Sequence, residues 1–386
     1  MNDPAVPVRT DSGYRSPILN RPGAVDAAES SPDSGVPLHY GDPLGEQRAA
    51  DSGMVVIDRS HRDVLTIGGE ERLTWLEGFV SQHVSELGDG SGAETLVLDA
   101  NGRVEHHALL ADSGGTLVVD TEAGRGAPLL EFLTKMVFWA DAAPAAADLG
   151  VLTLAGTALP AMLTAPDGTD VALPVGDYAS VPLPGGGMAR RTPWPLTGSV
   201  DLVVPRAELV AWFDAAVAAG ARPAGSWAFE AMRVAGTTPL RGRLGVDTDE
   251  KTIPHEIPTW IGAVSERGAV HLEKGCYRGQ ETVSRVHNLG RSPRVLLRLH
   301  LDGSVDDLPS PGDEVSAGGR SVGRVGTVVQ HHEYGPVALA LLRRAVPADA
   351  KLEIGGVSAA IDPDALPEES GPQAGREAVR RLRGQA

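Results

Sequence analysis

The segment from Lys274 to Glu281 holds the one cysteine of the chain between two glycines and two cations. It reads Lys274-Gly275-Cys276-Tyr277-Arg278-Gly279-Gln280-Glu281. Glycine allows backbone angles that other residues avoid, and it lets a ligand approach the main chain closely. Nearby positive charge favours the thiolate, which is the nucleophile and the metal-binding form of cysteine. The pattern therefore indicates a reactive thiol at Cys276. An inert buried thiol stays open as the alternative, because free cysteine is among the most buried residue types.

Helix signals begin directly after the cysteine. Glu281 precedes Arg285 by four residues, in the favourable order for an ion pair along a helix, and Gly290 is a typical stop. This spacing predicts a short helix from Gln280. Cys276 would then lie at or just before the helix N-terminus, where the helix dipole further favours the thiolate.

The octet resembles the hallmark of the YgfZ folate-binding proteins. These are relatives of the glycine-cleavage T-protein, a tetrahydrofolate-dependent aminomethyltransferase, and of mitochondrial iron–sulfur assembly factors. Four other segments are similar to family motifs, and the resemblance covers about residues 54–345. The segments are Asp58 to Arg62, Leu98 to Arg103, Glu230 to Gly236 and Ile253 to Glu256.

The resemblance implies a cofactor, partners and site residues. The cofactor would be tetrahydrofolate or a one-carbon derivative, held in a central cavity between domains. The protein would support assembly or repair of iron–sulfur clusters in client enzymes. Its partners would be these client enzymes and the iron–sulfur assembly proteins. Cys276 would be the reactive residue, with Lys274 and Arg278 favouring its ionisation. Gln280 and Glu281 would shape the loop, and Arg233 would contact the folate.

Two departures from the T-protein concern its catalysis. The T-protein turn reads Gly-Gly-Ile-Leu-Asp-Asp and its first aspartate is catalytic, but the matching text here places His106 at that position. A pterin-binding glutamate is also missing from the piece near Thr197 to Asp201. Neither histidine nor threonine replaces a carboxylate as an anionic acceptor. Glycine-cleavage activity is therefore not expected. A folate-dependent aminomethyltransferase or demethylase and a non-catalytic folate-binding scaffold remain as alternatives.

Composition excludes several classes of protein. One cysteine in 386 residues rules out an intramolecular disulfide, a zinc ribbon and a self-sufficient iron–sulfur site. The formal net charge of −17 argues against nucleic acid as a partner. No signal peptide and no apolar run of membrane-spanning length is evident, so a soluble cytoplasmic protein with no membrane partner is expected. No metal site is predicted, because the adjacent pairs His106–His107 and His331–His332 would face opposite sides of a strand.

The charge is unevenly distributed. Residues 231–300 hold 11 Lys and Arg against 7 Asp and Glu, a net of +4. A locally cationic segment in an acidic protein suits a small anionic ligand, and the glutamate tail of a folate is one. The other interpretation is that these cations pair with acidic neighbours.

Blocks of strands and helices followed by an all-β module predict an α+β protein. Residues 1–50 carry seven prolines and little apolar periodicity, which predicts a disordered extension. Apolar residues at three- and four-residue steps predict an amphipathic helix over 70–87. We expect a first α+β folate-binding unit over 51–148 and a second over 149–290. Short β segments over 291–362 predict an antiparallel barrel, and 363–386 a polar tail. The resemblance implies a T-protein-like arrangement of these domains around the folate cavity.

Overall fold

The computed structural model describes residues 13–235, 252–262, 268–289, 291–304 and 307–367. These residues belong to two compact units, each assembled from discontinuous segments of the chain. Unit 1 comprises residues 1–77, 84–95 and 106–237, and unit 2 comprises 78–83, 96–105 and 238–386. Unit 1 therefore crosses the boundary expected near residue 148. The reason is that strand β9 (Leu149–Gly156), just beyond that boundary, pairs with strand β3 (Met54–Asp58), which lies well before it.

Six α-helices are described. They are α1 (Pro43–Ser52), α2 (Arg72–Glu77), α3 (Gly126–Met136), α4 (Leu209–Ala218), α5 (Ser226–Ala235) and α6 (Gln280–Leu289). The helix predicted from Gln280 is confirmed as α6.

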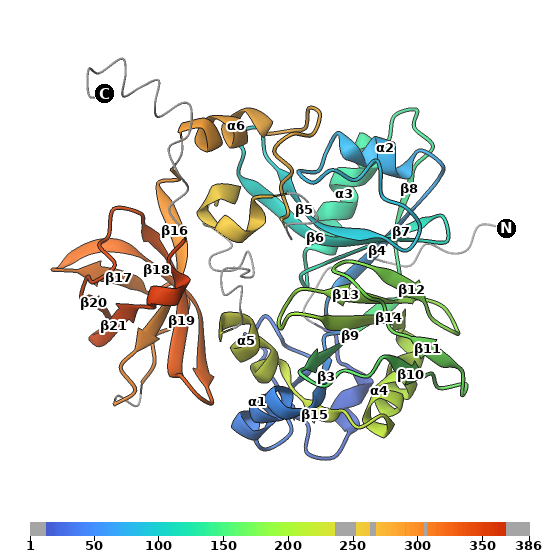
Figure 1. Ribbon diagram of the computed structural model, residues 1–386, viewed down its shortest axis with the longest axis horizontal. Coiled ribbons are helices and arrows are strands. Elements are labelled where there is room, and N and C mark those ends of the chain that lie inside the picture. Colours follow the sequence, from blue (N-terminus) through green and yellow to red (C-terminus); the bar gives the residue numbers. More distant parts are fainter. Residues whose placement is uncertain (1–12, 236–251, 263–267, 290, 305–306, 368–386) are drawn as a thin grey trace. The chain divides into compact units, whose positions relative to one another are not determined.

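Two larger sheets lie mainly in unit 1 (Figure 1). The six-stranded sheet has the order β12 (Ser180–Pro182), β13 (Met188–Thr192), β14 (Ser199–Pro205), β9 (Leu149–Gly156), β3 (Met54–Asp58), β15 (Arg222–Ala224). The five-stranded sheet has the order β5 (Gly92–Leu98), β6 (Val104–Ser113), β7 (Thr116–Thr121), β4 (Asp63–Gly68), β8 (Ala143–Ala146). Two small hairpins complete this unit. They are β1 (Val25–Asp26) with β2 (Pro37–His39), and β10 (Met162–Thr164) with β11 (Asp170–Ala172).

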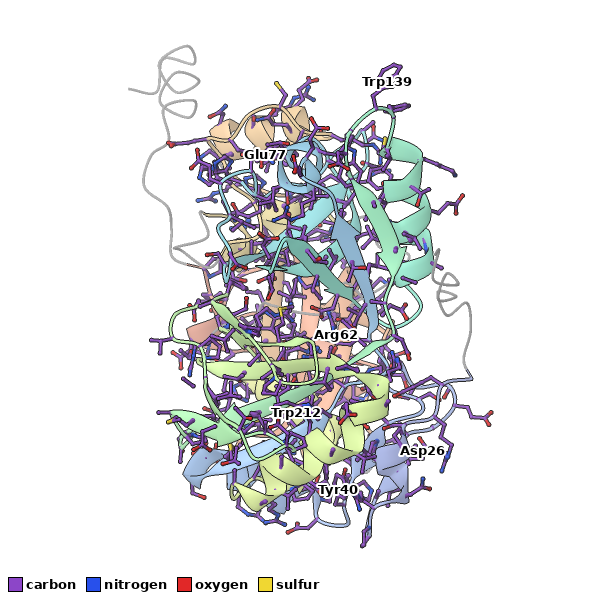
Figure 2. All side chains as sticks on the ribbon, turned by 90° about the vertical axis from the view of Figure 1, so that its right-hand side faces the viewer. Asp26, Tyr40, Arg62, Glu77, Trp139 and Trp212 are labelled. Carbon is purple, nitrogen blue, oxygen red and sulfur yellow. The ribbon has the colours of Figure 1, made fainter. Side chains whose placement is uncertain are left out.

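Apolar side chains fill unit 1 on both sides of the six-stranded sheet. One buried cluster joins strands β3, β9 and β14 to helix α4, where Trp212 is 1% exposed (Figure 2). A second cluster places Val151 and Val203 of the six-stranded sheet against Val64 and Val118 of the five-stranded sheet. The two sheets therefore share one core, which fixes the positions of the polar residues described below.

The C-terminal part of unit 2 is a closed antiparallel barrel, drawn in orange and red in Figure 1. Its order is β16 (Arg294–Leu301), β19 (Gly335–Arg343), β18 (Arg320–His331), β17 (Glu314–Ala317), β20 (Leu352–Ile354), β21 (Val357–Ile361). Pairing of β16 with β21 closes the barrel, and its interior is lined by buried Val, Leu and Ile. The expected α+β fold with a C-terminal barrel is confirmed.

The predicted disorder of residues 1–50 is wrong for residues 13–50. Ile18 is fully buried in the core of unit 1, and the Tyr14 hydroxyl donates to Ser60 Oγ at 2.6 Å. Glu46, in helix α1, accepts hydrogen bonds from the backbone N–H groups of Tyr40 and Gly225. This segment is ordered by a few buried apolar side chains and many polar contacts. Its sequence therefore lacks the hydrophobic periodicity from which order is usually predicted. Residues 1–12 lie outside the described residues.

The helix predicted over 70–87 is only partly present. Helix α2 ends at Glu77, and a turn follows, with an isolated bridge between Val80 and Val97. The backbone N–H of Ser81 donates to Leu96 O, and its side chain donates to Ala269 O. These contacts lie within unit 2. The hydrogen bonds of Ser81 stabilise a non-helical backbone here, in spite of the helical spacing of the apolar residues. Within the described ranges, no helix is long and apolar enough to cross a membrane.

Candidate functional site

The loop formed by residues 274–281, hereafter the Cys276 loop, presents its thiol to solvent between two buried side chains. Cys276 is a free, exposed cysteine. Lys274 is 7% exposed and Tyr277 is 8% exposed. The alternative of a buried thiol is therefore wrong. No hydrogen bond to the Cys276 side chain is found among the described residues, so the loop itself does not occupy the sulfur.

The buried Lys274 anchors the start of this loop. Its ammonium group donates to the carbonyl oxygens of Val80 at 2.7 Å and Gln82 at 2.9 Å. It also lies 5.1 Å from the centre of the Tyr277 ring. The segment 78–83 that accepts these bonds is itself held by Gln82, whose side-chain amide donates to Gly268 O at 2.6 Å. These contacts give Lys274 an anchoring position, in addition to the charge expected from the sequence.

Tyr277 is the second buried anchor of the loop. Burial raises the pKa of its hydroxyl above the ordinary range, and the hydroxyl oxygen has no hydrogen-bond partner within the described ranges. The buried Tyr277 ring therefore anchors the loop mainly by apolar packing, next to the exposed Cys276 in the chain.

Arg278 and Gly279 fix the other end of the loop to the turn between strands β5 and β6. Arg278 Nη1 lies 2.6 Å from the Glu105 carboxylate. Gly279 has φ +83°, and a Cβ there would lie 2.6 Å from Asp99 O. Gly275 differs, because a Cβ on it would meet nothing within 4 Å. Gly279 is thus required by the backbone, whereas Gly275 leaves open space beside the thiol.

The last residues of the octet close the loop and start helix α6. Gln280 Nε2 donates to Lys274 O at 3.3 Å, which joins the two ends of the loop. Glu281 and Arg285 form the expected ion pair at 2.5 Å on the exposed side of α6. The helix begins four residues after Cys276, so the thiol precedes the first turn instead of lying within it. The sequence did not single out Glu105 or the carbonyl groups of Val80 and Gln82, which are distant in the chain.

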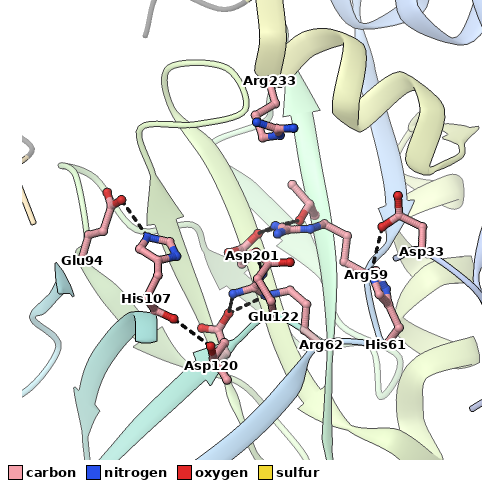
Figure 3. Close-up of polar contacts among 12 residues, drawn as sticks. Asp33, Arg59, His61, Arg62, Glu94, His107, Asp120, Glu122, Asp201 and Arg233 are labelled. Carbon is pink, nitrogen blue, oxygen red and sulfur yellow. Dashed lines mark hydrogen bonds and ion pairs between the residues drawn. The ribbon is translucent and has the colours of Figure 1, made fainter. Parts of the chain in front are cut away.

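Unit 1 contains a buried network of charged residues around strands β7, β13 and β14 (Figure 3). Asp120 lies 2.8 Å from Arg62 and 2.6 Å from Arg190. Arg190 also contacts Asp201 at 2.9 Å, and Asp201 lies 3.8 Å from Arg59. Burial alone would raise the pKa of Asp120, but its ion pairs with Arg190 and Arg62 outweigh burial and hold that pKa below its usual range. The sequence signal for this network is the presence of charged residues such as Asp120, Arg190 and Asp201 inside otherwise apolar strands.

At one side of this network, Arg59 meets two aromatic rings. Its guanidinium carbon lies 3.9 Å from the centre of the Phe229 ring and 5.5 Å from that of Trp194. Burial, with the neighbouring charge of Arg62, lowers the pKa of Arg59 to about 10. The indole N–H of Trp194 is buried and has no acceptor among the described residues. This cluster therefore contains a donor that an acceptor atom of a ligand would satisfy.

Two residues that the sequence analysis discussed for the folate site also lie in unit 1. Arg233, on α5, is 2% exposed and contacts the Glu230 carboxylate at 2.5 Å. Its side chain points from α5 toward the Arg59 and Asp201 region in Figure 3. His106, which the resemblance aligns with the T-protein's aspartate, is 7% exposed on strand β6.

Most of the described cations of the basic segment 231–300 make contacts within the protein. Besides Lys274 and Arg278, four arginines of this segment form ion pairs with carboxylates. These pairs are Arg233–Glu230, Arg285–Glu281, Arg294–Glu256 and Arg298–Asp362. This favours internal pairing over a free cationic surface. The parts of the segment at 236–251, 263–267 and 290 lie outside the described residues.

Comparisons with known proteins agree with this architecture. The family model of the CAF17 C-terminal beta-barrel domain matches residues 294–368. A putative chloroplastic transferase of Arabidopsis thaliana is 24% identical over 291 residues, which are 72% of this chain and 62% of that protein. The chain thus spans less than two thirds of the length of that relative. An aminomethyltransferase of Neisseria meningitidis is 24% identical over 287 residues, or 65% of this chain and 75% of that protein.

Among solved structures, the glycine cleavage system aminomethyltransferase T from Bartonella henselae matches with a TM-score of 0.74 and 16% identity. The match covers 90% of this chain and 96% of that chain. The fold is accordingly that of the T-protein-like, or aminomethyltransferase-like, proteins. The C-terminal barrel is similar to that of the CAF17 proteins, and the related sequences and the solved structure are similar to this chain over most of its length.

Proposed function

We propose that this protein binds tetrahydrofolate or a one-carbon derivative and supports the assembly or repair of iron–sulfur clusters in client enzymes, with Cys276 as its reactive thiol. The observation that carries the proposal is the geometry of the Cys276 loop. The thiol is exposed, while Lys274 on one side and Arg278 on the other are tied to separate segments. A fixed backbone around an exposed sulfur holds it for a reacting partner without a cost of ordering the loop.

The chemistry open to this thiol follows from its surroundings. Three further thiolates would be needed for a typical iron–sulfur cluster, and the chain has no other cysteine. Across the described ranges, no group of three or more His, Cys, Asp or Glu is arranged to hold a metal ion. Cys276 would therefore act as a nucleophile or as one transient ligand, with the cluster being substrate that a client or assembly protein also holds.

The folate part of the proposal is supported by unit 1. The pteridine ring of a folate is flat and carries both hydrogen-bond donors and acceptors. The Trp194 and Phe229 rings form an aromatic pair with centres 6.2 Å apart, and the Trp194 indole N–H offers a donor without an acceptor among the described residues. Arg233, which is held by Glu230, would orient the ligand from helix α5. The cytoplasmic location expected from the sequence belongs to this same proposal.

The active transferase is the less favoured function. In the T-protein the catalytic position is a carboxylate, and the buried His106 occupies the matching position here. We expect no folate-dependent turnover of glycine-cleavage substrates.

Complementation tests the role of the thiol. In a strain that lacks the gene, the activities of iron–sulfur enzymes should be restored by the unchanged protein and not by Cys276→Ala or Cys276→Ser. A cluster-independent enzyme serves as the control, and the melting temperatures of the variants should match that of the unchanged protein. Full restoration by a folded Cys276→Ala protein would refute the role of the thiol.

Calorimetry tests folate binding separately. Trp194→Phe keeps the aromatic ring and removes the N–H donor, so tetrahydrofolate should bind more weakly to this variant. Trp139→Phe is the matched control, because Trp139 is 96% exposed. Absence of tetrahydrofolate binding to the unchanged protein would remove the folate part and leave the role of the thiol standing.

A further inference from the structure

Two adjacent aromatic side chains of unit 1 are turned outward in the loop between helix α3 and strand β8. Phe138 is 71% exposed and Trp139 is 96% exposed. Their ring centres lie 6.2 Å apart, and in Figure 2 the Trp139 ring projects beyond the ribbon. Scattered exposed apolar residues are ordinary, but two large rings side by side are characteristic of contact surfaces. The proposed folate and thiol chemistry uses neither ring.

The loop that carries the rings is held from both sides. Glu71 and Asp141 bond reciprocally, since the Glu71 N–H donates to Asp141 O at 3.0 Å and the Asp141 N–H donates to Glu71 Oε2 at 2.7 Å. Trp75 Nε1 donates to Met136 O at 3.0 Å just before the rings. Gly69, at φ +100°, fits so closely that a Cβ would lie 2.1 Å from Asp141 O. The rings are therefore displayed by an ordered backbone and are ready to bind without further ordering.

The charge beside the rings is negative. Glu70, Glu71 and Asp141 are exposed, and none of them forms an ion pair with a described residue. Asp141 Oδ2 accepts from the Glu70 N–H at 2.9 Å, and this type of bond leaves the carboxylate charge in place. Glu131, on the neighbouring helix α3, is neutralised by Lys135 at 2.5 Å and adds no net charge. The two rings thus have an acidic collar formed by Glu70, Glu71 and Asp141.

The acidic collar determines which kind of binding partner this surface favours. A second copy of the chain would bring the same three carboxylates against this collar, and like charges oppose such a contact. An anionic lipid surface is opposed for the same reason, and the overall charge of −17 adds to that repulsion. Arginine on a partner would satisfy both features, because guanidinium pairs with carboxylates and also stacks on the face of an indole ring.

We infer that the surface formed by Phe138, Trp139 and the acidic collar docks a protein partner that offers an apolar pocket rimmed by Arg or Lys. The rings would fill the pocket and supply most of the binding free energy, and the collar would set orientation and speed of association.

Photo-crosslinking from position 138 identifies the partner protein whose binding is then measured. Full-length protein with a benzophenone amino acid in place of Phe138 is expressed in the native host, and the crosslinked protein is identified by its peptides. That partner is then purified, and its Kd is measured against the unchanged protein and its variants. Trp139→Ala should weaken binding about 10-fold or more. Val175→Ala is the control, because Val175 is an equally exposed apolar residue of unit 1, at 88% exposure, and its Kd should not change.

The collar is tested by charge removal that keeps hydrogen-bond acceptors. Glu70→Gln with Asp141→Asn should slow association, and added salt should reduce the difference from the unchanged protein. Equal binding by Trp139→Ala and the unchanged protein would overturn the proposal, as would failure to crosslink any protein that binds when purified. Two other results would also overturn it: self-association that Trp139→Ala abolishes, and sedimentation with phosphatidylcholine vesicles that Trp139→Ala abolishes.

Discussion

Arg278 and Glu105 lie 2.6 Å apart and connect the Cys276 loop to the first residues of strand β6. The two side chains are 37% and 40% exposed, so solvent screens the pair. Such a pair contributes up to about 1 kcal/mol to stability. The main role of the pair is therefore to hold the backbone beside the thiol. From the sequence alone, the charge of Arg278 was expected to favour ionisation of the thiol instead.

The first prediction separates these roles of Arg278. Glu105→Arg should leave the melting temperature nearly unchanged but loosen the loop, seen as faster amide hydrogen exchange at residues 276–279. The double variant Glu105→Arg with Arg278→Glu should restore the slow exchange, because the pair forms again with reversed charges. If the single variant leaves exchange at its original rate, the pair has no positioning role.

The two glycines of the loop give the second prediction. Gly279→Ala should destabilise unit 2 by roughly 1–3 kcal/mol, because its left-handed backbone and the nearby Asp99 carbonyl exclude a side chain. Gly275→Ala should not alter stability, since a Cβ there meets nothing within 4 Å. Denaturation of both variants measures this contrast.

Gly275→Ala then becomes a probe of the client contact. A stable Gly275→Ala protein that fails to complement the deletion strain would indicate that a partner approaches the main chain at that residue. Full complementation would show instead that the open space beside the thiol is unused.

The N-terminal segment supports a third prediction. Ile18→Ala should destabilise unit 1 by about 2–5 kcal/mol, the usual range for removing a fully buried large aliphatic side chain. Val25→Ala, in the same segment but 43% exposed, is the control and should have little effect. Thermal unfolding of both variants measures the difference, and equal melting temperatures would show that the segment does not contribute to the core.

The barrel and helix α6 could be predicted from the sequence because their signals are local. Short β segments separated by Gly and Pro mark the strands, and the Glu281–Arg285 spacing marks the helix. The octet likewise indicated Cys276 as a candidate residue, because its residue types and spacing are local. The anchors of the loop could not be predicted, since Lys274 bonds to carbonyl groups almost 200 positions away and any residue supplies a carbonyl. The fold of residues 13–50 was missed for a related reason, because it depends on contacts such as Tyr14 with Ser60.

The last prediction concerns pH and His255, in the short helical turn Pro254–Glu256 of unit 2. Burial, reinforced by the nearby His287 ring and the Arg344 guanidinium, lowers the pKa of His255 from 6.5 to about 4. Both ring nitrogens are buried without a hydrogen-bond partner among the described residues. The remaining charged neighbours, Glu256 and Arg294, are paired with each other at 2.7 Å.

Because the pKa of His255 is lower in the folded than in the unfolded protein, the unfolded protein binds the proton first as pH falls. The stabilising contribution of neutral His255 is present in full above about pH 6.5 and is lost between there and about pH 4. The loss approaches roughly 3 kcal/mol. His255→Phe keeps a ring that cannot be protonated, so denaturation at about pH 7 and about pH 5 should show a smaller drop in stability than in the unchanged protein. His39→Gln, in unit 1, is the control and should keep the full drop. An equal drop in His255→Phe would show that other groups cause the pH dependence.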